Sequence, residues 1–264
     1  MTKPFVKWAG GKMQILPQII KQVPKKINTY YEPFLGGGAL FFSVLPNNAV
    51  LSDINQRLIR TYLGIKNNPL EVIDLLKSYP TTEDFFIKLK NTNIDDKSDV
   101  EVAAWLIYLN KTCFNGLYRV NKNNIFNVPY GKYNNPSIYD EENILNCSKA
   151  LSNAVINDKS FEAAVENAKE GDFVYFDPPY IPISATSSFT SYTANGFDLN
   201  QQIKLRDLAL QLKNKGVFVL LSNSSSSLVK QLYGSDFKLI KINSARNISS
   251  KSSSRGKIKE YLIC

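Results

Sequence analysis

The apolar run Phe173-Val174-Tyr175-Phe176, followed at once by Asp177-Pro178-Pro179-Tyr180, constrains the fold of this chain more than any other feature. Such a run predicts a buried strand, and the two prolines end it because proline fixes φ and has no N–H to donate to a sheet. The strand therefore brings a carboxylate and an aromatic ring to a sheet edge. Ligands of open α/β sheets bind at the carboxyl ends of strands, which favours a site here over a plain turn.

The residues of this turn suit the exocyclic amino group of a flat heterocycle. Asp177 offers an anionic acceptor, Tyr180 offers a stacking face, and the Pro178 carbonyl is free to accept a hydrogen bond. The chain contains no histidine, which excludes His-based triads, HExxH zinc sites and imidazole proton shuttles. The three cysteines are scattered without a CxxC pair, so they predict neither a disulfide framework nor a zinc knuckle.

Length and charge set broader limits. With 264 residues, the chain can form one large domain or a core with a smaller insertion. It has no apolar run of membrane-spanning length and no signal-peptide core near its start, so we expect a cytoplasmic protein without a membrane partner. The net charge of +9 indicates a polyanionic partner, or else merely reflects the Lys and Asn enrichment of an AT-rich genome.

The apolar pattern predicts an α/β domain that is split in sequence. Residues 1–56 and 147–264 alternate between strands and helices, whereas 57–146 show helical spacing with long loops. The expected strands are 30–34, 49–53, 173–176, 217–221 and 261–263. The expected helices include 14–23, 40–44, 102–109 and 201–212.

Two glycine-containing segments near the start resemble ligand-binding loops. Residues 33–39 follow a strand and open a helix, as in nucleotide-binding turns, and Asp53 ends the next strand where an acid can bind a ribose hydroxyl. Glycine also serves plain tight turns. The segment 7–12 is not a Walker A loop, because Met13 stands where Ser or Thr should follow the lysine. This segment is either an exposed basic turn or one side of a ligand-binding site that is lined by aromatic and cationic side chains.

A nucleic-acid-binding segment is expected at 110–121, where aromatic, amide and basic residues alternate, and 127–133 continue this character. Arginine can read guanine in the major groove, and aromatic rings can wedge between bases. A structured loop whose aromatic residues pack inward is the alternative. The tail 251–257 offers small donors and cations for phosphates, or is a solvated loop.

A series of segments spread over nearly the whole chain resembles the Dam-type DNA adenine-N6 methyltransferases, in particular the GATC-specific methylases of restriction–modification systems. These segments are KWAGGK at 7–12, PFLGGGALFF at 33–42, LSDIN at 51–55, CFNGLYRVN at 113–121, NVPYGKY at 127–133, FVYFDPPY at 173–180, SFTSYTANGF at 188–197 and LSNSS at 221–225. Their order, with the glycine-rich loop first and DPPY last, is similar to that of the α group of amino-methyltransferases.

The resemblance implies an α/β fold, a Rossmann-like seven-stranded methyltransferase sheet with an inserted helical DNA-recognition domain at 57–146 and the catalytic domain in 1–56 and 147–264. It implies S-adenosylmethionine (AdoMet) as the methyl donor, no metal, and double-stranded DNA as the partner. Residues matching cofactor-contacting positions of the family are Trp8, Lys12, Phe34, Gly36, Asp53, Ser160, Phe161 and Asp177. Residues matching positions that touch the GATC site are Lys7, Phe114, Asn115, Leu117, Arg119 and Pro129.

The same resemblance implies that the enzyme methylates N6 of an adenine flipped out of the duplex, with Asp177, Pro178 and Tyr180 as catalytic residues. Segment 182–196 matches the loop that covers the target base. A restriction endonuclease of the same target would be a functional partner, not necessarily a physical one.

Other readings stay open. An rRNA amino-methyltransferase also carries DPPY after a glycine loop, although such chains are typically shorter between the two motifs. A cytosine-C5 enzyme needs a nucleophilic Cys, usually after Pro, whereas Cys113 follows Thr112. A protein-glutamine methyltransferase would favour Asn at position 177. A catalytically silent DNA-binding module would not need an intact cofactor motif together with an intact target-base motif.

Overall fold

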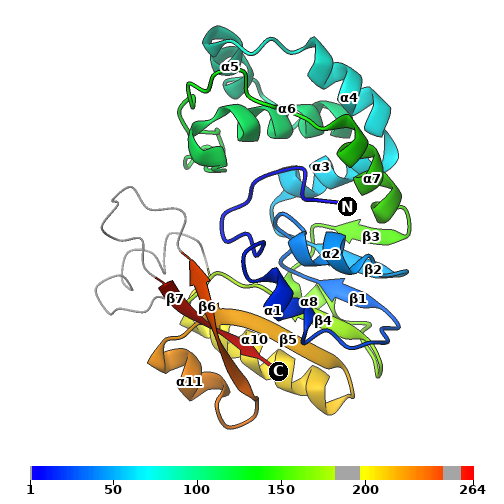
Figure 1. The fold of residues 1–264 in the computed structure, drawn as a ribbon, viewed down its shortest axis with the longest axis vertical. Coiled ribbons are helices and arrows are strands. Elements are labelled where there is room, and N and C mark those ends of the chain that lie inside the picture. Colours follow the sequence, from blue (N-terminus) through cyan, green and yellow to red (C-terminus); the bar gives the residue numbers. More distant parts are fainter. Residues whose placement is uncertain (1, 182–196, 246–256) are drawn as a thin grey trace. The chain divides into compact units, whose positions relative to one another are not determined.

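The computed structural model describes residues 2–181, 197–245 and 257–264 (Figure 1). The chain forms two compact units. The first contains Met1–Gly11, Gly36–Leu45 and Asp53–Asp158, and the second contains Lys12–Leu35, Pro46–Ser52 and Lys159–Cys264. The insertion predicted at 57–146 thus lies within the first unit, while the segment 1–56 is divided between both. Assignment of DNA recognition to the insertion stays a prediction.

The strands form a seven-stranded sheet in the order β3-β2-β1-β4-β5-β7-β6. Their bounds are β1 Tyr30–Glu32, β2 Ala49–Ser52, β3 Ala154–Asn157, β4 Phe173–Phe176, β5 Phe218–Ser224, β6 Leu239–Ala245 and β7 Lys257–Ile263. β1 pairs in parallel with β2 and β4, and β4 pairs in parallel with β5. β7 runs antiparallel to β5 and to β6. The predicted seven-stranded α/β fold is confirmed.

The core of the second unit explains why β4 is apolar throughout. All four residues of β4 are buried, as expected for a parallel strand that is covered on both faces. The helices of the second unit are α1 Leu16–Ile20, α8 Phe161–Ala164, α10 Leu199–Asn214 and α11 Ser227–Tyr233. Leu205, Ala209 and Leu212 of α10 share one buried cluster with Val174 of β4 and Val219 of β5. This packing buries the apolar side chains of β4 and β5, whose register is given by their backbone pairing.

The first unit is built around one buried helix. Its helices are α2 Ala39–Val44, α3 Gln56–Asn67, α4 Pro69–Ser78, α5 Glu83–Lys90, α6 Asp99–Thr112 and α7 Glu141–Leu151, with a 3₁₀ turn at Phe114–Gly116. α6 is buried from Val102 to Asn110, which suits a helix that is apolar on all sides. Ser98 and Glu101 form a capping box at its start. The mostly irregular segment after α6 is tied together by the bridges Cys113–Tyr130 and Val120–Phe126.

Two expectations about secondary structure need correction. The helix predicted at 14–23 extends only over Leu16–Ile20, with Pro17 in its first turn and no side-chain cap. Such a short helix has little intrinsic stability, so its bounds depend on the burial of Leu16 and Ile19. The strands β3 and β6 were not predicted. β3 has only the short apolar run Ala154-Val155-Ile156, and its Val155 is exposed, unlike any residue of β4.

Gly64→Ala is expected to destabilise the first unit. A Cβ at Gly64 would lie 2.5 Å from the Asp99 carbonyl oxygen and 2.9 Å from the Ala103 Cβ, both in the adjoining helix α6. Overpacking against backbone should outweigh the helix propensity gained with alanine and lower the free energy of unfolding by about 1–3 kcal/mol. Urea denaturation measures this, with Asn67→Ala at an exposed position of α3 as the control. An unchanged urea midpoint for Gly64→Ala would show that α3 and α6 can move apart enough to accept the methyl group without loss of stability.

Candidate functional site

The carboxylate of Asp177 follows β4 and is held from two sides. Ser222 Oγ donates a hydrogen bond of 2.6 Å to Oδ1, and Lys12 Nζ lies 2.8 Å from Oδ2. Ser222 is fully buried and Lys12 is 7% exposed, so both contacts are largely shielded from water. The Asp177 side chain retains 20% exposure and can still be reached by a ligand. A partly shielded anion of fixed orientation is suited to hydrogen bonding with a polar N–H group.

Tyr180 is oriented at both ends of its side chain. Its hydroxyl donates to Glu260 Oε2 at 2.9 Å, and Lys12 Nζ lies 4.8 Å from the centre of its ring. Burial, and after it the charge of Asp177, raises the pKa of Tyr180 well above its ordinary value. The phenol therefore stays protonated as a donor at neutral pH, and the ring is fixed beside the carboxylate.

The backbone that follows Asp177 is held by two buried amide side chains. Gln202 Nε2 donates to the Pro179 carbonyl at 2.8 Å, and the Ile181 N–H donates to Asn223 Oδ1 at 3.1 Å. Asn223 Nδ2 donates in turn to Gln202 Oε1 at 3.2 Å. Helix α10 and strand β5 thus fix the proline turn, and buried Pro178 lies within it.

An aromatic cluster lies beside the end of β4 in the second unit. Phe34 is stacked on Phe161, with ring centres 5.6 Å apart and planes inclined by 22°. Phe176 and Phe197 meet Phe34 edge to face. Ser160 caps helix α8 by accepting from the Ala163 N–H at 3.3 Å. Phe34 and Phe161, which come from segments far apart in sequence, therefore belong to one largely buried apolar cluster.

In the first unit the peptide groups of Gly36 are anchored by Asp53 and Tyr62. Asp53 Oδ2 accepts from the Gly36 N–H at 3.0 Å and Oδ1 accepts from the Asn55 N–H at 3.0 Å. The Tyr62 hydroxyl donates to the Gly36 carbonyl at 3.0 Å. Burial raises the pKa of the Asp53 carboxyl, against the opposing effect of the two N–H bonds. Two acceptor positions are used, so Asp53 keeps capacity for further donors.

Trp8 explains why position 36 must be glycine. Gly36 has a φ of +48°, and a Cβ there would lie 2.8 Å from Trp8 Cδ1. The indole is stacked on Tyr118, with ring centres 5.2 Å apart. A residue with a side chain at position 36 would therefore be strained in its backbone and would displace the indole.

The candidate DNA-binding residues of the segment after α6 share a folded loop. The Phe114 N–H donates to the Pro129 carbonyl at 2.9 Å, and the Asn115 N–H is bonded to the Tyr133 hydroxyl at 2.9 Å. Phe114 is 52% exposed, whereas Leu117 is half-buried. Asn115 has a positive φ of 58°. A large exposed aromatic side chain on a held backbone is suited to contact with bases.

Arg119 is exposed but oriented by a neighbour. Its Nε donates to Asn127 Oδ1 at 2.7 Å, and one terminal nitrogen donates to the Asn127 carbonyl at 3.2 Å. These bonds engage one side of the guanidinium group. A guanidinium group presents several fixed donors, so its other side can still bind an acceptor.

Asn110 joins Lys7 to this loop. Its Oδ1 accepts from the Lys7 N–H at 2.7 Å, and its Nδ2 donates to the carbonyls of Lys7 and Gly116 at 2.8 Å each. Asn110 is only 2% exposed, while Lys7 is exposed. The structure therefore brings Lys7 beside the segment that carries the other candidate DNA-binding residues.

Comparison with known proteins identifies the family. The family model described as D12 class N6 adenine-specific DNA methyltransferase matches residues 8–248 of this chain. The chain belongs to this family. The Type II methyltransferase M1.LlaDCHI of Lactococcus lactis subsp. cremoris is 50% identical over 99% of this chain and 94% of its own length. The Type II methyltransferase M.MjaIII of Methanocaldococcus jannaschii is 42% identical over 96% and 95%. A DNA adenine methylase of Haemophilus influenzae is 35% identical over 98% and 92%.

The predicted enzyme class, an adenine-specific DNA methyltransferase, is therefore confirmed. Within each unit the structure also groups the residues that the sequence singled out. Lys12, Phe34, Ser160, Phe161, Pro178 and Tyr180 accompany Asp177 in the second unit, and the remaining candidates lie in the first. Their individual roles stay predictions.

Several side chains that hold the candidate site residues of this methyltransferase in place were not predicted from the sequence. They are Asn110, Gln202, Ser222, Asn223 and Glu260. Ser222 and Asn223 lie in the LSNSS segment of the resemblance, which pointed to the region without a role. Asn110 lay in the nucleic-acid-binding segment without being distinguished. No sequence signal separates Gln202 or Glu260 from ordinary polar surface residues.

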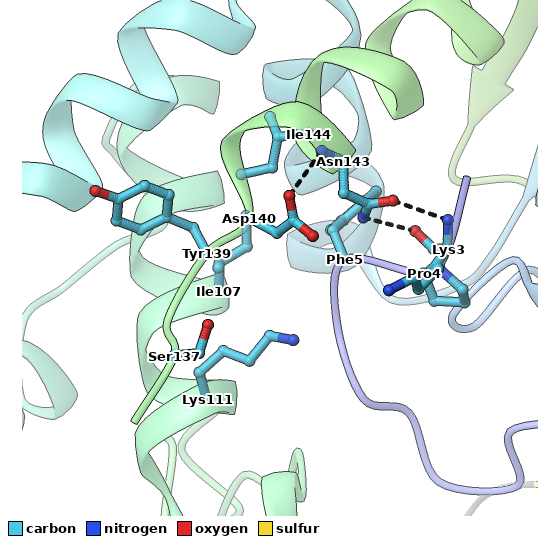
Figure 2. A pocket seen from close by; sticks show the side chains of 10 residues that line it. All are labelled: Lys3, Pro4, Phe5, Ile107, Lys111, Ser137, Tyr139, Asp140, Asn143 and Ile144. Carbon is cyan, nitrogen blue, oxygen red and sulfur yellow. Dashed lines mark hydrogen bonds between the residues drawn. The ribbon is translucent and has the colours of Figure 1, made fainter. Parts of the chain in front are cut away.

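A pocket of about 240 Å³ in the first unit of the methyltransferase is not the candidate site (Figure 2). Its wall combines Lys3 and Lys111 with Asp140 and Asn143. Figure 2 shows Asn143 bonded to the backbone of Lys3 and to Asp140. Burial, and after it the charge of Lys7, lowers the pKa of Lys111, while Asp140 opposes this. None of the sequence-predicted site residues lines this pocket.

Three further observations concern only the described parts of the methyltransferase. No described helix is both long and apolar enough to span a membrane. Within residues 2–181, 197–245 and 257–264, no group of three or more His, Cys, Asp or Glu side chains could hold a metal ion. The predicted base-covering loop 182–196 and nearly all of the phosphate-binding tail 251–257 lie outside the described residues.

Proposed function

We propose that this enzyme transfers a methyl group from AdoMet to N6 of adenine within GATC sites of double-stranded DNA. The observation that carries the proposal is the held carboxylate of Asp177 at the end of β4, with its two fixed contacts and the Tyr180 ring beside it. Adenine presents the flat ring and the N–H donors that this arrangement suits.

Each unit, taken by itself, holds groups that suit part of AdoMet. In the first unit, the remaining acceptor positions of Asp53 suit ribose hydroxyls, and the Gly36 backbone beside Trp8 suits close approach of a ligand. In the second unit, the half-buried ring of Phe34, stacked on buried Phe161, suits a flat adenine ring, with Ser160 next to it. We assign Lys12 to cofactor binding as well. When bound, AdoMet supplies a methyl group activated by a sulfonium.

The residues around Asp177 would make the adenine amino group reactive. The N6 lone pair is delocalised into the ring, so the nitrogen is a poor nucleophile. Hydrogen bonds from N6–H to the Asp177 carboxylate and the Pro178 carbonyl would favour a pyramidal nitrogen with a localised lone pair. A carboxylate has about four acceptor positions, of which Ser222 and Lys12 use two, so Asp177 can still accept these bonds.

Electrostatics and stacking complete the mechanism. Positive charge develops on N6 as the methyl group is received. The fixed carboxylate of Asp177 would offset this charge until N6 releases its extra proton to the carboxylate or to water. The target base must leave the duplex stack to reach this position, and the face of Tyr180 would hold it there. The buried network of Gln202 and Asn223 would keep the proline turn in place during this step.

Target recognition is assigned to the loop of the first unit. Arg119, held by Asn127, would bind a guanine of the site, and Leu117 and Pro129 would contact a thymine methyl group. Exposed Phe114 would insert into the stack, with Asn115 and Lys7 beside it. The net charge of +9 supports a DNA partner.

The cellular setting follows from the same proposal. We place the enzyme in the cytoplasm together with the DNA that it modifies. Its relatives include proteins named Type II methyltransferases, which supports a restriction endonuclease of the same target as a functional partner. An rRNA amino-methyltransferase remains the alternative substrate class to be tested.

Labelled AdoMet distinguishes these possibilities. The purified protein is incubated with a duplex that carries a single GATC, with the same duplex changed to GTAC, and with a structured ribosomal RNA fragment. Label recovered as N6-methyladenine in the GATC duplex alone is the expected result. Equal label in both duplexes would contradict the GATC assignment, and label in RNA alone would favour the rRNA enzyme.

A further inference from the structure

The register between β4 and β5 places Ser222 beside Asp177. Tyr175 pairs with Leu220, and Phe176 pairs with Leu221, so the next residues along the chain are Asp177, directly after β4, and Ser222 of β5. Residues two apart in a strand share a face, which puts Tyr175 on the same face as Asp177. The Tyr175 hydroxyl accordingly lies 3.1 Å from Ser222 Oγ, and Ser222 Oγ lies 2.6 Å from Asp177 Oδ1.

The direction of this hydrogen-bond chain is determined by its end. A carboxylate can only accept, so the Ser222 hydroxyl donates its proton to Asp177. Ser222 Oγ must then accept from the Tyr175 hydroxyl. Burial, and after it the charge of Asp177, raises the pKa of Tyr175 well above its ordinary value, so the phenol retains its proton. Tyr175 and Ser222 are 1% and 0% exposed, which keeps water from replacing either donor.

We propose that Ser222 is a positioning residue for Asp177 and that Tyr175 acts through it. The proposal rests on the function assigned to Asp177 above. Fixing Oδ1 to β5 would limit rotation of the carboxylate, so that Oδ2, which contacts Lys12 here, keeps one orientation for the ligand. Catalysis depends steeply on such orientation, because small misplacements of a reacting group have large effects on rate. Ser222 itself does not touch the base in this assignment.

Four variants of the 264-residue chain test the proposal. Ser222→Ala removes the hydroxyl, Ser222→Cys retains similar volume with a much weaker donor, and Ser222→Thr retains the hydroxyl on a larger side chain. Tyr175→Phe removes only the first donor of the chain. Each is compared with the wild type in kcat and KM for the GATC duplex and for AdoMet, and its fold is checked by thermal melting.

We expect Ser222→Ala and Ser222→Cys to lower kcat by about 10- to 100-fold, since a hydrogen bond to a charged group is lost. Both KM values should stay within about threefold, and Ser222→Thr should recover most of the rate. Tyr175→Phe should lower kcat by about 2- to 10-fold, because only a neutral bond is lost. The double variant with Ser222→Ala should be no slower than Ser222→Ala alone, because Tyr175 acts only through Ser222.

Opposite outcomes would overturn the proposal. Ser222→Cys with wild-type kcat would show that volume matters and donation does not. Multiplication of the two single effects in the double variant would show that Tyr175 acts independently. Should Ser222→Ala not fold, Ser222→Cys and Tyr175→Phe still decide between these outcomes. Absence of methyl transfer by the wild type would contradict the proposed function itself, whereas an active wild type with unaffected Ser222 variants contradicts this inference alone.

Discussion

Asp177→Asn is expected to lower the rate of methyl transfer at saturating AdoMet by about a thousandfold or more while DNA still binds. The amide is neutral, so it cannot offset the charge that develops on N6. In either orientation its NH₂ group would also replace an oxygen that accepts from Ser222 or Lys12, so a donor would face a donor. Single-turnover transfer of labelled methyl groups to a GATC duplex measures the loss, and fluorescence anisotropy measures DNA binding.

The control for this variant is Asp207→Asn, which makes the same chemical change at an exposed position of α10 and should keep the wild-type rate. Asp177→Asn also removes the charge that Lys12 contacts at 2.8 Å. A lower melting temperature is therefore expected, since removing one partner of a shielded ion pair is destabilising. A rate above about a tenth of wild type would show that the carboxylate charge is not required.

Arg119→Ala is expected to reduce discrimination for GATC by about 10- to 100-fold, because one good side-chain contact to a base contributes about 1–3 kcal/mol of selectivity. The guanidinium is held by Asn127 and retains donors on its other side. The measurement is the ratio of kcat/KM between the GATC duplex and duplexes in which one guanine is replaced. Selectivity should be lost only at the guanine that Arg119 contacts.

Lys122→Ala provides the matched control, because it removes a positive charge from an exposed position of the same loop. It should weaken binding to all duplexes equally, with a shallower salt dependence, and leave the ratio unchanged. An equal loss for all duplexes with Arg119→Ala would instead place Arg119 on the DNA backbone. Arg119→Lys should resemble the alanine variant in selectivity, because lysine lacks the two-pronged donor geometry.

Much of the fold could be predicted from the sequence because its signals are local. The apolar run of β4 and the prolines after it act within a few residues, so both the strand and its end were predicted correctly. β1, β2 and β5 were found for the same reason. Where the local signal is weak, prediction was wrong or absent. The helix at 14–23 is shorter than predicted, and the partly buried β3 was not seen.

In the candidate site, too, some features could be predicted from local sequence signals and others could not. By itself, the sequence determined the family, the enzyme class and the place of Asp177 at a strand end, since each rests on contiguous motifs whose order along the chain is preserved. Only the tertiary structure showed that Ser222 contacts Asp177, that Glu260 binds Tyr180 and that Gln202 holds Pro179. These contacts join separate strands and helices. They depend on strand order, register and burial, which arise only when the whole sheet has formed.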